Sequence, residues 1–265
     1  MTGDISGQSQ DQDVVEVIDE GGAGAALILC EHASHRIPAE YDGLGLSDEA
    51  AISHAAWDPG ARDLALNLMR QLNGTLVAST VSRLVYDCNR PPEAASAMPE
   101  KSEVIEVPGN VGLTQAQRDV RTDAIYRPFC EAVTAQIEER AARGQPTALL
   151  TVHSFTPVYY GEMRETEIGI LHDTDTALAD AMLKAAAKLS HRITHRNRPY
   201  GPEDGVTHSL QIHGLAHGLP NVMIEVRNDL LQTPAQVAAI GDELAAMITP
   251  ALIHLGLQTQ GAAHA

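Results

Sequence analysis

Three short apolar runs along the chain each end at a histidine or a glutamate. The runs cover residues 26–30, 148–152 and 222–224, and the residues that follow them include Glu31, His32 and His35, then His153, then Glu225. Continuous apolar runs of this length are typical of strands that are buried on both faces of a sheet. Ligands of open α/β sheets bind beyond the carboxyl ends of such strands. We therefore expect these side chains to converge on one metal and acid–base site.

Segments with the periodicity of helices separate the strand-like runs. One helix is expected to begin at Asp58-Pro59-Gly60, because apolar residues then recur every four positions until Asn73-Gly74. Further helices are predicted over residues 114–143, with a bend at Pro128, and over 176–190, 207–217 and 234–255. Further strands are predicted over residues 14–18, 75–78 and 167–172, and a β-rich run at 82–88 is closed by two prolines.

The alternation of strands and helices predicts an α/β fold. We expect a single domain over residues 13–258, with a central, mostly parallel (mixed) sheet that is flanked by helices. The polar residues 1–12 and the Ala/His-rich residues 259–265 are predicted to form flexible tails. The stretch from 93 to 113 has no periodic pattern, so we expect a long loop there, and long loops in compact domains are often functional.

The composition narrows the choice of partners. The chain carries 35 acidic residues against 18 lysines and arginines, which gives a formal net charge of −17. Such a surface repels phosphate groups, so we expect neither nucleic acid nor a membrane as a partner. No apolar run approaches the length of a membrane span, and the N-terminus has no signal pattern. The odd set of Cys30, Cys88 and Cys130 is typical of reduced thiols, which favours a cytoplasmic setting.

His32 and His153 are the candidate metal ligands. Imidazole suits zinc, and a catalytic zinc ion usually has three protein ligands and a water molecule. An isolated histidine at a strand end is more often a hydrogen-bonded core residue. Two at equivalent positions weaken that interpretation but do not overturn it on their own. The third ligand is either His35, three residues after His32, or Asp58, which at a helix start can also act only as an N-cap. Glu31 is a weaker candidate because alternation along a strand directs it away from His32.

Glu225 is the candidate general base. A carboxylate between apolar strand residues is costly unless it has a partner. One interpretation is an ion pair with Arg227, two residues along on the same face, and the other is an acid–base role in a pocket.

Arg83 and Arg90 bracket the β-rich run and are candidates for binding a substrate carboxylate. A guanidinium group binds a carboxylate through two parallel hydrogen bonds, and an acidic protein can still place such a group in a local pocket. The alternative is structural pairing with the many acidic residues of the chain. Asn89 either orients the same carboxylate or makes a turn.

Five motifs, taken together and in order, resemble the N-formylglutamate amidohydrolase family. They are Cys30-Glu31-His32-Ala33-Ser34, His54-Ala55-Ala56-Trp57-Asp58-Pro59-Gly60, the stretch from Ser82-Arg83 to Asn89-Arg90-Pro91-Pro92, His153-Ser154-Phe155-Thr156-Pro157, and Glu225-Val226-Arg227. The resemblance extends from Leu27 to Leu231, and the family in turn is similar to zinc carboxypeptidases and aspartoacylases.

The resemblance implies a zinc-carboxypeptidase-like fold and a set of roles. His32 and His153 would bind Zn²⁺, Asn89 and Arg90 would hold the substrate carboxylate, and Glu225 would activate water. Arg83 and Arg227 are the further candidates for substrate binding. The carboxypeptidase pattern has glutamate three residues after the first histidine, where this chain has His35, so the family pattern favours Asp58 as third ligand.

The expected function is therefore hydrolysis of the N-formyl or a related N-acyl amide of an acidic amino acid. With N-formyl-L-glutamate as substrate the products would be L-glutamate and formate, a step of histidine degradation. Two alternatives stay open. One is a carboxypeptidase-like metallopeptidase that acts on small peptides, and the other is a non-catalytic relative that binds ligands without a metal. The oligomeric state is left open.

Overall fold

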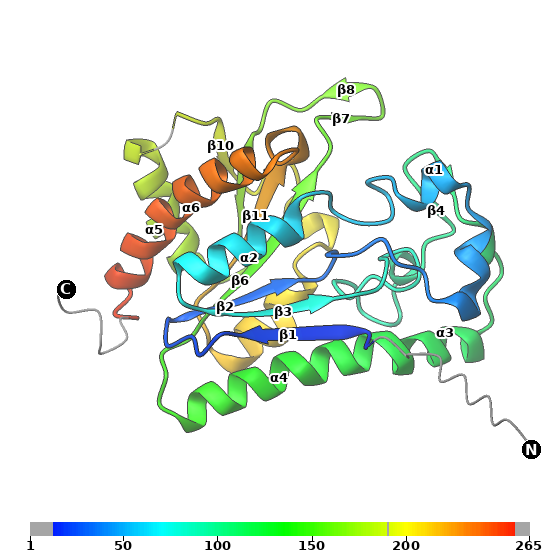
Figure 1. Ribbon diagram of the computed structural model, residues 1–265, viewed down its shortest axis with the longest axis horizontal. Helices are drawn as coiled ribbons and strands as arrows, with labels where there is room; N and C mark the ends of the chain where they lie inside the picture. Colours follow the sequence, from blue (N-terminus) through cyan, green and yellow to red (C-terminus); the bar gives the residue numbers. More distant parts are fainter. Residues whose placement is uncertain (1–12, 190, 258–265) are drawn as a thin grey trace, which may run out of the picture.

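A seven-stranded mixed sheet forms the centre of the computed structural model, which describes residues 13–189 and 191–257 (Figure 1). The strands lie in the order β1 (Val15–Asp19), β3 (Thr75–Ser79), β2 (Ala26–Cys30), β6 (Ala148–Phe155), β11 (Asn221–Arg227), β9 (Ile168–Leu171) and β10 (Thr194–Arg196). The four central strands from β3 to β11 are parallel, and antiparallel pairing occurs between β1 and β3 and between β11 and β9. The predicted single α/β domain with a mostly parallel sheet is confirmed.

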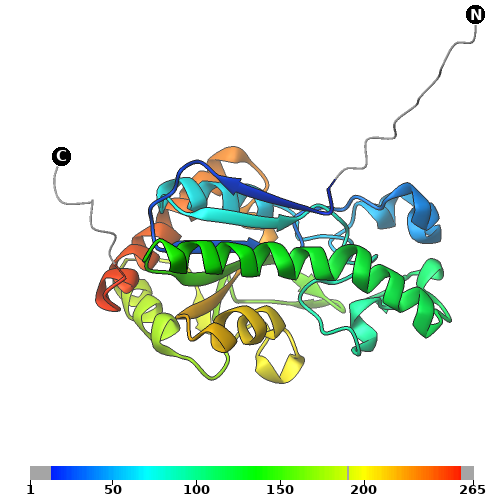
Figure 2. The same cartoon turned by 90° about the horizontal axis from the view of Figure 1, so that it is seen from below.

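Helices cover both faces of this sheet. The helices on one face are α2 (Ala61–Gln71), α5 (Ala177–Leu189) and α6 (Pro234–His254). The other face packs against α4 (Arg127–Ala142), which Figure 2 shows extending across the front of the molecule, preceded by α3 (Gln115–Arg121). Strand β2 supplies Ile28 to the first core and Leu27 and Leu29 to the second, as the two-residue period of a strand requires.

Short elements extend the connections at the carboxyl ends of the strands. Helix α1 is a single turn at Asp48–Ala51. Two small hairpins are formed by β4 (Lys101–Ser102) with β5 (Ile105–Glu106), and by β7 (Val158–Tyr159) with β8 (Glu162–Met163). Turns of 3-10 helix occur at Ala39–Gly45, Ala95–Ala97, Pro108–Asn110, Pro202–Asp204, Leu215–His217 and Asn228–Leu230. The long loop expected at 93–113 therefore contains the β4–β5 hairpin and two helical turns.

The expected strand at 82–88 is wrong, because this segment forms a series of turns. Local side chains satisfy the backbone here: the Leu84 N–H donates to Ser82 Oγ, and the Asn89 N–H donates to Asp87 Oδ1 at 2.9 Å. Such local bonds compete with the hydrogen-bond ladder of a sheet. Leu84 and Tyr86 are nevertheless buried. The apolar run therefore indicates that this segment is buried, and it does not indicate a strand.

Two helices differ in detail from the expectation. The helix predicted over 114–143 is interrupted by a π-helical turn at Thr122–Tyr126, and Pro128 lies in the first turn of α4, directly after it. The helix predicted over 207–217 contains a π-helical turn at Leu210–Gly214.

Helix α6 is long and apolar enough to cross a membrane by length and composition, so the expectation that no apolar run approaches this length is wrong. Half of its most apolar window is buried, and α6 packs against α2 and α5. These features are those of a core helix.

The predicted tails and Ser190, the last residue of a predicted helix, lie outside the described residues.

Candidate metal centre and active site

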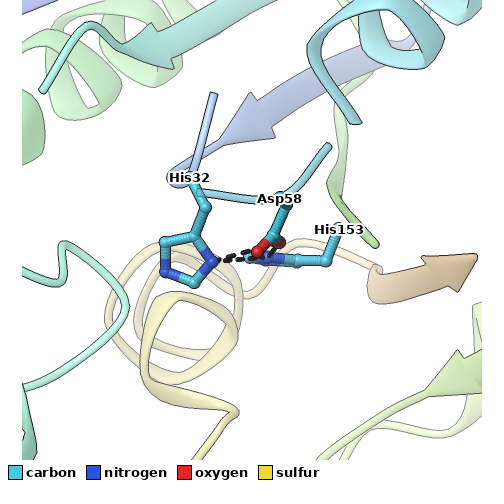
Figure 3. A group of neighbouring side chains, drawn as sticks. All are labelled: His32, Asp58 and His153. Atoms are coloured by element: carbon cyan, nitrogen blue, oxygen red, sulfur yellow. Dashed lines mark hydrogen bonds and ion pairs between the residues drawn. The ribbon is translucent and has the colours of Figure 1, made fainter. Parts of the chain in front are cut away.

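Three buried side chains meet at the carboxyl end of the central strands (Figure 3). Asp58 Oδ2 lies 3.2 Å from His32 Nδ1 and 2.9 Å from His153 Nδ1, and the two Nδ1 atoms are 3.1 Å apart. His32, Asp58 and His153 are each no more than 3% exposed. The structure therefore brings together the two predicted histidines and one of the two alternatives for the third ligand.

The fold fixes these three side chains through the backbone. His32 follows the end of β2, whereas His153 lies within β6, because this strand continues to Phe155. Asp58 precedes α2, and its N–H donates to the His32 carbonyl at 3.0 Å. Gly60 begins this helix with φ +82°, and a Cβ atom there would lie 2.5 Å from Leu231 Cβ. Glycine is thus required at the turn that holds Asp58.

A second carboxylate contacts the outer nitrogen of each histidine. His32 Nε2 lies 2.7 Å from Asp87 Oδ1, and His153 Nε2 lies 3.3 Å from Glu31 Oε2. A carboxylate at Nε2 favours a proton on that nitrogen, so Nδ1 is the nitrogen that is available to a metal ion once its own proton is lost. Without a metal ion, protons on the Nδ1 atoms allow both histidines to donate to Asp58 Oδ2. A cation between the three atoms would replace these protons and bind all three.

The dimensions of this cluster fit a zinc site. A tetrahedral zinc ion with bonds of about 2.0–2.1 Å keeps its donor atoms about 3.3 Å apart, close to the spacing of these three atoms. Two imidazoles and one carboxylate are a ligand set that zinc accepts, and the fourth position would face the cavity. His35 is exposed and packs edge-on against the ring of Trp57 with centroids 4.9 Å apart, so its side chain is outside the cluster.

The electrostatics of the cluster follow from burial and close opposite charges. Burial alone would raise the pKa of Asp58, but the charge of His32, hydrogen bonds from both histidines and the charge of Arg83 hold it well below its usual range. Burial alone would lower the pKa of His153, but the carboxylates of Glu31 and Asp58 raise it well above its usual range. The cluster is therefore a buried site with excess negative charge, which attracts a cation.

The cluster opens into a cavity of about 180 Å³. Most of the residues predicted for the site line its wall, namely His32, Asp58, Arg83, Asn89, Arg90, His153 and Glu225. Arg227 is not on this wall: its Nε donates to Asp229 Oδ1 at 2.8 Å, and its Nη1 donates to the Arg164 carbonyl at 3.1 Å.

The residues predicted to bind a carboxylate differ in how many of their polar groups already have hydrogen-bond or ion-pair partners. Arg83 contacts Asp58 Oδ1 at 3.2 Å and Asp87 Oδ2 at 2.8 Å. Its guanidinium group is therefore already paired with the two carboxylates that contact the ring nitrogens of His32. Asn89 uses its amide to hold Val206 and Ser209 backbone groups, at 2.7 and 2.9 Å. Among the ion pairs of the described residues, none includes Arg90, whose Nη1 donates to the Asn89 carbonyl.

Glu225 lies within β11 beside His153 of β6 and is 6% exposed. The alternative ion pair with Arg227 is absent, because that guanidinium contacts Asp229 and Glu167. One carboxylate oxygen of Glu225, Oε2, is buried without a hydrogen-bond partner among the described residues. Burial raises the pKa of Glu225 to about 7, against the lowering effect of His153. A carboxylate of this kind, at a cavity wall, is poised to exchange a proton near neutral pH.

Sequence reasoning missed the supporting carboxylates and part of the cavity wall. Asp87 lies in a quoted motif, and a charged residue inside a buried segment was the available signal. From the sequence, Glu31 is a weak candidate ligand and the next candidate for the base, although its position next to the candidate ligand His32 also suits support of an imidazole ring. The wall residues Glu103, Tyr159 and Tyr200 come from loops and a two-residue strand without a periodic signal. His54 lies in one of the five motifs but was not assigned a role.

Comparisons with known proteins agree with this architecture. A family model described as N-formylglutamate amidohydrolase matches residues 24–232. A crystal structure of a gene product from Agrobacterium tumefaciens superimposes with a TM-score of 0.90 at 51% identity, over 92% of this chain and 96% of the other. N-formylglutamate amidohydrolase from Ralstonia eutropha JMP134 superimposes with a TM-score of 0.65 at 19% identity, over 91% and 98%. No curated protein sequence matches the chain.

We predict that the purified protein takes up about one zinc ion per chain and that Asp58, not His35, is needed for it. His153→Ala and Asp58→Ala should each lose most of the bound zinc, because each removes one of three ligands. His35→Ala is the matched control and should retain it. Elemental analysis after zinc loading and desalting checks this. Zinc lost in His35→Ala but kept in Asp58→Ala would reverse the assignment.

Proposed function

The chain belongs to the N-formylglutamate amidohydrolase family, and from this premise we propose that it hydrolyses the N-formyl or a related small N-acyl amide of an acidic amino acid. The observation that carries the proposal is the His32–Asp58–His153 cluster, which opens into a small cavity whose wall includes Glu225 and an arginine without a carboxylate partner. These are the parts that metal-assisted amide hydrolysis needs: a Lewis acid site, a general base and an anchor for the substrate.

His32, Asp58 and His153 are proposed to hold Zn²⁺. When bound, zinc supplies positive charge that polarises the amide carbonyl and acidifies the attacking water. Asp87 and Glu31 fix the orientation of the two imidazoles from behind, as the outer carboxylates of metal-binding histidines do in other sites. Arg83 holds Asp58 and Asp87 together, so we assign it to this support and to the cavity wall.

Glu225 is the proposed general base. Its partly unsatisfied, buried carboxylate accepts a proton from the attacking water and then delivers it to the nitrogen of the leaving amine. Both proton transfers need a group whose pKa lies near the working pH, and burial raises the pKa of Glu225 toward that range. Glu31 is the next candidate, but it lies behind His153 and is not part of the cavity wall.

Arg90 is the proposed anchor for the substrate carboxylate. Its guanidinium group lies on the cavity wall, and among the described residues it donates through Nη1 to the Asn89 carbonyl, so further donors remain for a carboxylate. Asn89 supports this position through its bonds to the backbone of Val206 and Ser209. We assign Arg227, which lies off the wall, to the support of β11 and its neighbours.

The size of the cavity favours a small amide over a peptide. Pockets for drug-sized ligands measure roughly 300–1,000 Å³, and this cavity measures about 180 Å³. A carboxypeptidase-like enzyme needs room for a longer chain.

The free thiols of Cys30, Cys88 and Cys130 support the expected cytoplasmic setting.

Replacing Arg90 by lysine should impair substrate use although the positive charge is kept. Lysine cannot form the paired hydrogen bonds of a guanidinium group, so we expect kcat/KM for N-formylglutamate to fall by roughly 30-fold, or about 2 kcal/mol. Arg227→Lys is the matched control and should change kcat/KM far less. Steady-state kinetics of zinc-loaded enzymes checks this, and an unchanged kcat/KM in Arg90→Lys would make Arg90 a structural residue.

Replacing Glu225 by glutamine should abolish turnover while the fold and the metal content persist. The amide is nearly isosteric but cannot accept a proton, and a general base contributes typically ~10²–10⁴-fold to the rate. In the wild type, activity should decline as the pH falls, because Glu225 must be ionised to act. The measurements are kcat, zinc content and a thermal melt for both proteins. A folded, zinc-loaded variant with more than about a tenth of the wild-type kcat would move the base to another residue.

A further inference from the structure

The mouth of the cavity is formed by three segments that are far apart in the sequence, and one residue joins them. Glu103 Oε2 lies 2.7 Å from His54 Nε2, and Glu103 Oε1 accepts a hydrogen bond from the Tyr160 N–H at 3.0 Å. His54 and Glu103 both line the cavity, as does Tyr159 beside Tyr160. One carboxylate thus connects the loop after α1, the β4–β5 hairpin and the turn of the β7–β8 hairpin.

The backbone of Glu103 is in a conformation that glutamate rarely adopts. Its φ is +52°, and it is the first of the two residues between β4 and β5. Two-residue hairpin turns with positive φ at this position usually carry glycine, since a Cβ atom is strained there. Strain of this kind persists where the side chain is held by its surroundings, and it points to a role for that side chain.

The carboxylate is well shielded and strongly bonded for a loop residue. The side chain of Glu103 is 12% exposed. Partial burial alone would raise its pKa, but hydrogen bonds from the Tyr160 N–H and from His54 lower it below its usual range. The carboxylate therefore stays ionised and keeps both bonds near neutral pH.

The β7–β8 hairpin is also fixed at its base, so its turn is the part that the carboxylate controls. Arg164 follows β8, and its guanidinium carbon lies 4.3 Å from the ring centroid of Tyr159 and 4.9 Å from that of Tyr200. The Arg164 N–H donates to the Pro157 carbonyl at 2.8 Å. In Figure 1 this hairpin and β4 both lie toward the end of the sheet where β2 points. Contacts of Arg164 therefore hold the base of the β7–β8 hairpin, and Glu103 holds its turn at the cavity mouth.

We propose that Glu103 determines the substrate size of this enzyme by tying the β7–β8 hairpin and the His54 loop into a closed rim. The proposal rests on the proposed function and adds to it a class of substrate: N-acyl amino acids with a small acyl group, to the exclusion of bulky acyl groups. With the tie intact, the rim keeps the cavity near its present volume. Without it, the hairpin tip moves away and longer amides enter.

The test compares Glu103→Gly with wild type and with Glu106→Gln. Glycine removes the carboxylate and relieves the positive-φ strain, so the variant should melt no lower than wild type. Glu106→Gln removes a carboxylate from the same hairpin, where it pairs with Lys101 at the surface. For each protein, kcat/KM is measured for N-formylglutamate and for N-benzoylglutamate.

We expect the ratio of kcat/KM for the benzoyl over the formyl substrate to rise about tenfold or more in Glu103→Gly and to stay unchanged in Glu106→Gln. Amide hydrogen exchange over residues 158–163 provides a readout without substrate, and it should become faster only in Glu103→Gly. Unchanged exchange at these residues, or an unchanged ratio in an active Glu103→Gly enzyme, overturns the proposal.

Failure of the proposed function gives a different result. In that case the wild-type enzyme hydrolyses neither amide at any zinc concentration, whatever the exchange data show. The size selection is then measured as the ratio of the dissociation constants of the same two compounds. A ratio that is equal in wild type and Glu103→Gly overturns the role of Glu103 on its own.

Discussion

The close approach of three buried ligand atoms, Nδ1 of His32, Nδ1 of His153 and Oδ2 of Asp58, is the constraint on which the rest of the site depends. The parallel pairing of β2 with β6 and the turn before α2 force His32, His153 and Asp58 into contact. Separating these three side chains would require a different strand register or a different turn at Gly60. The backbone therefore holds them in contact. The neighbouring charges follow from it. Asp87 and Glu31 contact the Nε2 atoms of His32 and His153, and Arg83 neutralises part of the negative charge of these carboxylates.

The groups proposed for catalysis and those proposed for substrate selection lie on different kinds of element. Glu225 is set beside His153 by the register of β11 with β6, so the proposed base and a proposed ligand share one ladder of backbone hydrogen bonds. Arg90 is placed by turns and not by a strand, and Glu103 by a hairpin that projects over the cavity. The proposed base and the proposed ligand His153 thus lie on strands, whereas the groups proposed to select the substrate lie on loops.

The sequence predicted the elements that have a strong period and missed those held by local hydrogen bonds. The strands at 26–30 and 148–152 and the helix at 234–255 could be predicted because burial on both faces, or a long apolar stripe, leaves a continuous pattern. The turns at 82–88 could not, since Ser82 and Asp87 replace the sheet ladder with side-chain bonds that have no period. His32 and His153 were identified from strand ends, although β6 continues past His153. The tie from Glu103 to Tyr160 depends on the folding of loops far apart in sequence, so no local pattern indicated it.

The central claim is that His32 Nδ1, His153 Nδ1 and Asp58 Oδ2 enclose one metal ion. Anomalous scattering from a crystal of the zinc-loaded protein, recorded on both sides of the zinc edge, tests it most directly. The account predicts a single strong peak at about 2.0–2.1 Å from each of these three atoms, with the remaining position directed into the cavity. A peak coordinated by His35 or by the Nε2 atoms, or a zinc-saturated crystal without a peak at the cluster, would contradict it.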